Sequence, residues 1–174
     1  MPHLRLVTVD SAPLRWVSIS LTALQTIAAE IAVGGHDLET GGIILGRDDP
    51  ATRATEIVLA GGPGPQAIRE PRRFLRDLEY AKALAREAWH THRAQWIGEW
   101  HTHPHAEPVP SDVDLSSYAR HLNDPELAFD HFVSLIAGVR QDEPPVLTAW
   151  IVDRHSTRLA QLHQAEQDAH DRHL

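Results

Sequence analysis

The stretch Gly98-Glu99-Trp100-His101-Thr102-His103-Pro104 allows the fold around it to be predicted. Its two histidines are two residues apart, so on a β-strand both side chains leave the same face. A turn rich in proline then reverses the chain, and Asp114 arrives in the first turn of a helix. Two imidazoles and one carboxylate leave the fourth tetrahedral position of a zinc ion to water, which is the arrangement of a hydrolytic site. We therefore predict a strand, a turn and a helix that hold one zinc ion per chain through His101, His103 and Asp114.

The pattern extends to a serine and to a distant glutamate. Seven residues separate His103 from Ser111, which stands three positions before Asp114. Far upstream, Glu39 precedes an apolar segment with several glycines, Gly41 to Gly46. This combination resembles the JAMM motif of the JAB/MPN metalloprotease family, and the likeness covers most of the chain in the order of its elements. The resemblance implies an α/β fold of the JAB/MPN, cytidine-deaminase-like type: one domain with a mixed, curved β-sheet flanked by helices.

The resemblance also implies roles within the site. It makes Glu39 the general base and then the general acid, and it makes Ser111 a hydrogen-bond donor to the developing oxyanion. From the sequence alone, Glu99 and Glu107 compete for the role of base, because both stand close to the histidines. Glu99 has the same strand parity as His101, so its side chain should lie on the same face. We expect its carboxylate to contact and orient a metal ligand without touching the metal; the alternative is a plain surface charge. Ser111 has an alternative role as well, since Ser-x-x-Asp can cap a helix.

Single pieces of the motif carry little information in a chain with 13 histidines. His-x-His pairs also occur at His90 with His92 and at His103 with His105. Only the complete spacing predicts a metal site, so we expect His105 and Asp112 to lie at its rim. The histidines near the C-terminus are interpreted as scattered, solvated residues.

The resemblance extends to substrate and partners. Family members with the complete motif hydrolyse amide bonds at the C-terminus of ubiquitin-like proteins, in isopeptide conjugates or linear precursors. It implies a zinc-dependent peptidase that binds the C-terminal tail of a ubiquitin-like protein. Compact bacterial members work beside activating-type and conjugating-type enzymes of the same operon, some in antiphage defence and others in sulfur-carrier processing. Two alternatives stay open: a non-catalytic MPN scaffold or partner-dependent subunit, and a metallopeptidase acting on small peptide or amino-acid conjugates.

The composition agrees with one enzyme domain. The chain has 174 residues, which suits a single core, and a formal charge of −8, which argues against a nucleic-acid surface. It has no cysteine, so disulfides and thiol nucleophiles are excluded and a reducing cytoplasm is compatible. The first residues lack the apolar run of a signal peptide, and no segment is apolar enough to cross a membrane. We therefore expect a cytoplasmic protein without nucleic-acid or membrane partners.

Hydrophobic periodicity and turn signals predict the order of the elements. We place a JAB/MPN-type metalloprotease domain at residues 1–162 and a polar tail at residues 163–174. Gly61–Glu70 could serve as a reduced first insertion of the family, and the interval between Asp114 and Phe132 is too short for the second insertion. The predicted strands are Leu4–Val9, Gly41–Arg47, Glu56–Ala60, Gln95–His101, Phe132–Val139, Val146–Val152 and Arg158–Leu162. The predicted helices are Ser20–Val33, Pro71–His92 and Ser111–Leu122.

The predicted helix Pro71–His92 has an apolar stripe at helical spacing. Its inward-facing residues are predicted to be Phe74, Leu78, Ala81, Leu84, Ala85, Ala88 and Trp89. Arg72, Arg73 and Arg76 cluster at its beginning, and we interpret them as a solvated helix face.

Overall fold

The computed structural model of the chain describes residues 4–6, 16–49 and 54–165. The helices are α1 (Leu21–Gly34), α2 (Leu78–His92) and α3 (Asp112–Asn123). The strands are β1 (Arg5–Leu6), β2 (Trp16–Ile19), β3 (Gly41–Asp49), β4 (Ala54–Ala60), β5 (Ile68–Glu70), β6 (Arg73–Leu75), β7 (Gln95–Pro104), β8 (Phe132–Val139), β9 (Val146–Val152) and β10 (Thr157–Gln164). Within the described residues, no helix is both long and apolar enough to span a membrane.

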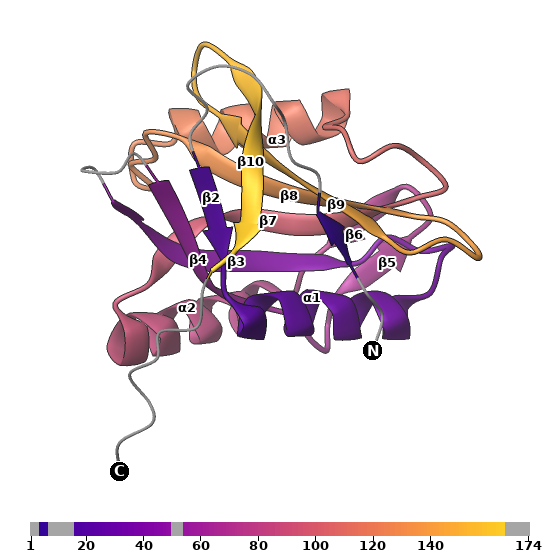
Figure 1. Ribbon diagram of the computed structural model, residues 1–174. Helices are drawn as coiled ribbons and strands as arrows, with labels where there is room; N and C mark the ends of the chain where they lie inside the picture. Colours follow the sequence, from indigo (N-terminus) through magenta and orange to yellow (C-terminus); the bar gives the residue numbers. More distant parts are fainter. Residues whose placement is uncertain (1–3, 7–15, 50–53, 166–174) are drawn as a thin grey trace.

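One mixed, curved sheet contains all of these strands except β5 and β6, which form a separate hairpin. The order in the sheet is β1-β9-β10-β2-β4-β3-β7-β8, with a further pairing between β8 and β9. β7 lies between β3, which is antiparallel to it, and β8, which is parallel to it. α1 and α3 lie on opposite sides of the sheet (Figure 1). The predicted α/β fold with a curved sheet and flanking helices is therefore confirmed.

Alternation along the strands separates two packed layers. Ile44 and Trp100 face the core that α1 covers, whereas Ile43 and Leu45 face α2. The register pairs Ile43 with Glu99, so Glu99 lies on the side of the sheet that α2 and α3 cover. Because side chains alternate, the two histidines of β7 share that side.

α1 has the ends that the sequence predicts. The Oγ of Ser20 accepts a hydrogen bond from the N–H of Ala23 (3.1 Å) and donates one to the carbonyl of Val58 (2.6 Å), which caps the helix and attaches it to β4. Gly35 ends the helix with φ 75°, a conformation that favours glycine.

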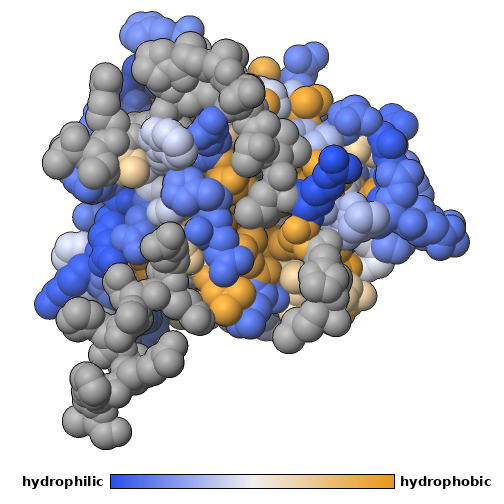
Figure 2. Space-filling view, viewed as in Figure 1, coloured by the Kyte–Doolittle hydropathy of each residue, from blue (hydrophilic) through white to orange (hydrophobic). Residues whose placement is uncertain are grey.

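On the face of the molecule drawn in Figure 2, hydrophobic side chains gather in the central part and hydrophilic ones lie along the edges.

The prediction of α2 is wrong at its beginning. The helix begins at Leu78, after Asp77, whose Oδ1 accepts a hydrogen bond from the N–H of Tyr80 (3.1 Å). The preceding residues pair as the β5–β6 hairpin, so the apolar stripe read as one helix belongs partly to a strand. Leu78 and Trp89 are 58% and 43% exposed, contrary to the prediction. Ala81 and Ala88 are buried as predicted, because small side chains make the contact with β3.

The other boundaries differ from the prediction by a few residues. β7 continues to Pro104, three residues beyond the predicted end, and therefore includes both histidines of the motif. β3 extends through Asp49, two residues beyond its predicted end. β10 continues to Gln164, two residues beyond its predicted end and into the predicted tail. Parts of the predicted first strand (residues 7–9) and of the tail (residues 166–174) lie outside the described residues.

Candidate functional site

The two histidines of the motif lie on β7 near its C-terminal end. His101 is 5% and His103 9% exposed, and the Nε2 atoms of the two rings are 3.0 Å apart. Gly41 of β3 stands opposite His101 in the register. A Cβ at Gly41 would overlap the carbonyl oxygen of Trp100 and lie 2.9 Å from the Cβ of His101. Glycine at this position therefore lets β3 approach the strand that carries the histidines.

Asp114 enters the site from the first turn of α3. Ser111 is the N-cap: its Oγ accepts from the N–H of Asp114 (3.2 Å), and Asp114 Oδ2 accepts from the N–H of Ser111 (2.7 Å). This capping box fixes both side chains at the helix end. The Ser111 hydroxyl also donates to Asp114 Oδ2 (2.6 Å). The helix-capping role considered for Ser111 is therefore present in the structure.

His101, His103 and Asp114 converge into one group. Their ligand atoms all lie within 4.8 Å of one another. Nε2 of His101 is 3.4 Å from Oδ1 of Asp114, and Nε2 of His103 is 3.3 Å from Oδ2. Two imidazole nitrogens and a carboxylate directed at one point could hold a metal ion.

The electrostatics of the group keep Asp114 ionised. Burial alone would raise the pKa of Asp114, but hydrogen bonds from His101, His103 and Ser111 outweigh burial and hold the pKa far below its ordinary value. Burial lowers the pKa of His101, yet the hydrogen bond to Asp114 and the nearby negative charges give a net rise. The aspartate is thus available as an anionic ligand at every pH near neutrality.

Glu39 lies beside this group, although 62 positions separate it from His101 in the sequence. Burial raises the pKa of Glu39, and the charges of His101 and His103 partly oppose that rise. The next residue joins Glu39 to β7: the N–H of Thr40 donates to Oγ1 of Thr102 (2.9 Å), and the N–H of Thr102 donates to the carbonyl of Thr40 (2.8 Å). A half-buried carboxyl with a raised pKa next to a potential metal site can accept and return a proton.

Glu99 is buried and not a surface charge. It is 9% exposed, and its carboxylate forms an ion pair with Arg76. The guanidinium of Arg76 also lies over the ring of Trp96, 6.0 Å from its centroid. The solvated helix face predicted for Arg76 is therefore wrong, because a buried carboxylate requires a partner. No local signal identifies Arg76 in the sequence, since the two residues are 23 positions apart.

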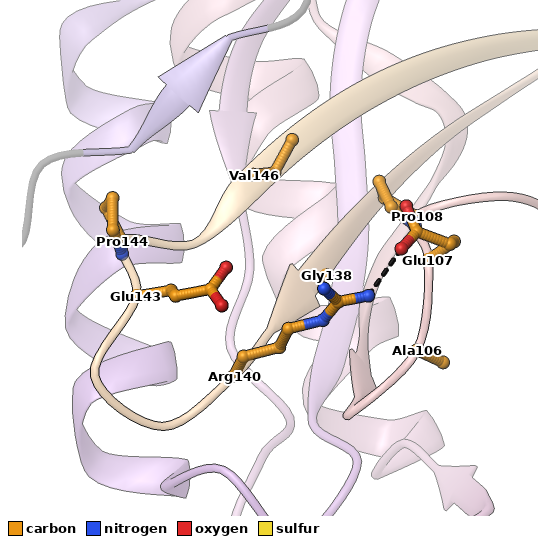
Figure 3. A pocket seen from close by; sticks show the side chains of 8 residues that line it. All are labelled: Ala106, Glu107, Pro108, Gly138, Arg140, Glu143, Pro144 and Val146. Atoms are coloured by element: carbon orange, nitrogen blue, oxygen red, sulfur yellow. Dashed lines mark hydrogen bonds and ion pairs between the residues drawn. The ribbon is translucent and has the colours of Figure 1, made fainter.

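Glu107 contributes its main chain to the site. Nδ1 of His103 is 3.1 Å from the carbonyl oxygen of Glu107, a contact in which Nδ1 carries the proton and Nε2 stays available as a ligand. The carboxylate of Glu107 is paired with Arg140 (Figure 3). The carbonyl of Pro108 accepts hydrogen bonds from Oγ1 of Thr148 (2.6 Å) and Nε1 of Trp150 (3.1 Å). These contacts hold the loop after β7 on the sheet.

A pocket of about 190 Å³ lies on the outer side of this loop. Figure 3 shows Arg140 inside it, paired with Glu107, and Glu143 opposite. Arg140 and Glu107 thus neutralise each other in the pocket, and their pairing attaches the loop to the end of β8. The remaining lining residues are Ala106, Pro108, Gly138, Pro144 and Val146.

The remaining residues of interest lie at the edge of the site. The side chain of His105 is 57% exposed and approaches Asp37 (3.0 Å). Asp112 is exposed in the first turn of α3. Neither belongs to the group of His101, His103 and Asp114, in line with the rim position predicted for them.

Comparisons with known proteins agree with this geometry. Residues 22–153 match the protein family described as prokaryotic homologs of the JAB domain. The chain is 30% identical over 105 residues to a CD-NTase/cGAS isopeptidase of Pseudomonas aeruginosa (strain BWHPSA011 / Pa011), a match that covers 58% of this chain and 64% of the relative. It is 35% identical over 94 residues to "Probable metalloprotease y4qB" of Sinorhizobium fredii (strain NBRC 101917 / NGR234), covering 52% and 57%. The chain thus spans less than two thirds of the length of these relatives.

A solved structure has the same fold. The solution structure of protein DSY2949 from Desulfitobacterium hafniense matches with a TM-score of 0.65, covering 91% of this chain and 99% of that chain. At 18% identity, this likeness concerns the fold alone.

Proposed function

We propose, since this chain belongs to the family of prokaryotic homologs of the JAB domain, that it is a zinc-dependent peptidase or isopeptidase. The bond that it cleaves is, in this proposal, the C-terminal amide of a ubiquitin-like protein. All five residues of the proposed site, Glu39, His101, His103, Ser111 and Asp114, lie inside the matched range. The observation that carries the proposal is the position of Glu39 beside the group of two histidines and one aspartate.

The donor group fits zinc. Two ligand atoms that each lie about 2.0–2.1 Å from a tetrahedral zinc ion are about 3.3 Å apart. The two Nε2 atoms are 3.0 Å apart, and each lies 3.3–3.4 Å from a different oxygen of the Asp114 carboxylate, values close to that spacing. A nitrogen-rich set with one carboxylate also favours zinc over magnesium or calcium, which prefer oxygen ligands. We therefore propose that His101, His103 and Asp114 hold one zinc ion per chain.

The chain's own residues then divide the reaction between them. Bound zinc would supply a hydroxide nucleophile near pH 7 and polarise the scissile carbonyl. Glu39 takes the proton of the attacking water and passes it to the departing nitrogen, and its raised pKa suits both transfers. Ser111 donates its hydroxyl hydrogen bond to the oxyanion as charge develops there. In the structure that hydroxyl donates to Asp114, so it must turn toward the substrate during the reaction.

The proposed substrate has an extended C-terminal tail that reaches the site. Among the described residues, β5 and β6 form a strand ladder only with each other, so an added strand along the edge of this hairpin is the binding mode we expect. Two curated relatives are named CD-NTase/cGAS isopeptidase, which favours an isopeptide conjugate of a CD-NTase-type enzyme as the first substrate to test. Activating-type and conjugating-type enzymes that form such conjugates are the partners we propose, in a bacterial conjugation system of the antiphage kind.

Intact-mass analysis tests the proposal. Ubiquitin-like fusions and isopeptide conjugates are incubated with the wild-type protein and with Glu39→Ala. We expect cleavage at the junction by the wild type only, with a loss of about 10²–10⁴-fold in the variant. Both proteins should contain one zinc ion per chain, since Glu39 is not a ligand. Full activity of Glu39→Ala would contradict the assigned role and make Glu99 the candidate base.

The two alternatives give different results in the same experiment. A non-catalytic scaffold binds zinc and leaves every fusion and conjugate intact. A peptidase of small conjugates leaves the proteins intact and cleaves short peptides or acyl amino acids. The first alternative is disfavoured because the chain keeps all five residues of the motif.

A further inference from the structure

Glu99 places a buried negative charge on the strand that carries the histidines. An ionised carboxylate at 9% exposure is costly unless it is paired. Its partner, Arg76, comes from outside the main sheet: it directly follows β6 and precedes Asp77, the N-cap of α2. The ion pair therefore joins the base of the β5–β6 hairpin to β7.

Arg76 is held from a second side by an aromatic cluster. Its guanidinium lies 6.0 Å from the ring centroid of Trp96. That ring packs edge-on against Phe129 (5.2 Å between centroids) and Phe132 (6.2 Å). A planar guanidinium can pair with a carboxylate and stack on a ring at the same time, whereas an ammonium is a compact point charge. The position of Arg76 is thus fixed relative to β7 by two residues of that strand.

The opposite strand of the hairpin holds the proposed catalytic glutamate. Glu70, the last residue of β5, accepts a hydrogen bond at its carbonyl oxygen from the N–H of Glu39 (3.0 Å). β5 is paired with β6 residue by residue, with Glu70 opposite Arg73. A continuous series of contacts therefore leads from Glu99 through Arg76 and the hairpin to Glu39.

The residue after Glu39 is attached differently. The main chain of Thr40 is hydrogen-bonded to Thr102 of β7, whereas the N–H of Glu39 bonds to the hairpin. A shift of the hairpin relative to β7 would therefore release Glu39 and leave Thr40 in place. The two neighbouring amides report separately on the hairpin and on the sheet.

We propose that Arg76 is a positioning residue for Glu39. Paired with Glu99, it holds the hairpin against β7 and so fixes the main chain of Glu39 beside the metal ligands. The consequence for catalysis rests on the proposed function, but the mechanical link does not.

Residue-resolved hydrogen exchange by NMR tests the link without any substrate. Arg76→Met leaves Glu99 unpaired and is open to misfolding, so the double variant Arg76→Met/Glu99→Gln, which removes both charges, is measured beside it. We expect the Glu39 amide to exchange about tenfold faster in the double variant, and the Thr40 amide to keep its wild-type rate. The matched control is Arg158→Met, which removes an ion pair with Asp153 (2.9 Å) at the β9–β10 turn and should change neither amide.

Kinetics give the second readout. In the double variant kcat should fall about tenfold while KM and zinc content stay at wild-type values, because only the proton carrier is displaced. Arg76→Lys should give an intermediate loss, since it keeps the charge without the planar geometry.

The outcomes are separable. Wild-type exchange of the Glu39 amide in the double variant would overturn the proposal, as would an equal acceleration at Glu39 and Thr40. If the wild-type protein cleaves no substrate, the proposed function fails, and the exchange rates alone decide whether Arg76 positions Glu39.

Discussion

The proposed metal ligands His101, His103 and Asp114 (the ligand half of the site) and the proposed base Glu39 (the base half) are held in place by different kinds of contact. His101, His103 and Asp114 come from one continuous segment, residues 101–114, and a capping box fixes the aspartate. Glu39 is only half-buried, and its main chain is held by a hairpin that is itself anchored through one buried ion pair. The ligands therefore depend on local geometry, whereas the position of the base depends on tertiary contacts. Substitutions in the two halves should therefore differ in their effects on zinc binding, stability and activity.

Removal of a ligand should have the largest effect. His101→Ala or Asp114→Ala is expected to abolish zinc binding and activity together. At a free zinc concentration about 1,000 times Kd, the metal contributes about 4 kcal/mol to the free energy of unfolding, which these variants lose. Zinc content by elemental analysis and unfolding with and without chelator measure this loss.

Two controls belong to that experiment. Chelation should remove this contribution from the wild type and leave the stability of His101→Ala unchanged. Asp114→Ala should be less stable than His101→Ala by about 1 kcal/mol, because it also removes one side of the capping box. Equal stability of the wild type with and without chelator would contradict the assignment of a metal site.

Gly41→Ala tests the contact between the halves. The added methyl group meets the main chain of β7 at Trp100 and His101, so we expect a loss of about 1–3 kcal/mol and weaker zinc binding. Gly35→Ala is the matched control: a Cβ there meets nothing within 4 Å, and only the backbone conformation (φ 75°, ψ −163°) costs about 1–3 kcal/mol. Zinc titration of both variants measures the difference. If both bound zinc equally well, close approach of β3 to β7 would be unimportant for the ligands.

Ser111→Ala separates capping from catalysis, with Ser20→Ala as its counterpart. Both serines are N-caps, of α3 and α1, so each replacement should cost about 1 kcal/mol of unfolding free energy. Only Ser111→Ala should lower kcat as well, by about 10²-fold, if the hydroxyl stabilises the oxyanion. Denaturant unfolding and steady-state kinetics give the two quantities. An unchanged kcat in Ser111→Ala would leave the cap as its only role.

The sequence predicts the convergence of His101, His103 and Asp114 because its determinants are local. Period-2 spacing places His101 and His103 on one face, and the helix start places Asp114 one turn after Ser111. The structure brings these three residues, the proposed metal ligands, together on the side predicted by strand parity. Burial of Glu99 follows from the same parity.

The base half was only partly predictable. The motif points to Glu39, but nothing local indicates which contacts hold it. The helical spacing of Phe74, Leu78 and Ala81 predicts a helix that begins at Pro71, but β6 contains Phe74 and the helix begins only after its N-cap, Asp77. In the sequence, Arg76 is indistinguishable from the other members of a basic cluster. Its partner Glu99 is distant along the chain, and only the fold brings the two together.

His121 gives the smallest expected effect, on the aromatic cluster that also supports Arg76. Its ring lies 5.4 Å from those of Trp96 and Phe132, and burial lowers its pKa below the ordinary value of 6.5. The charges that face it are Glu99 and Asp124, which oppose the shift, and Arg76 and Arg120, which add to it.

The imidazole of His121 therefore binds a proton more readily in the unfolded chain than in the folded one. Its contribution to the free energy of unfolding is complete above pH 6.5 and is lost as the pH falls through the lowered pKa of the folded state. In metal-free protein, unfolding at pH 8 and pH 5.5 should show a smaller loss of stability for His121→Gln than for the wild type. Parallel pH curves for the two proteins would contradict a neutral, buried imidazole at this position.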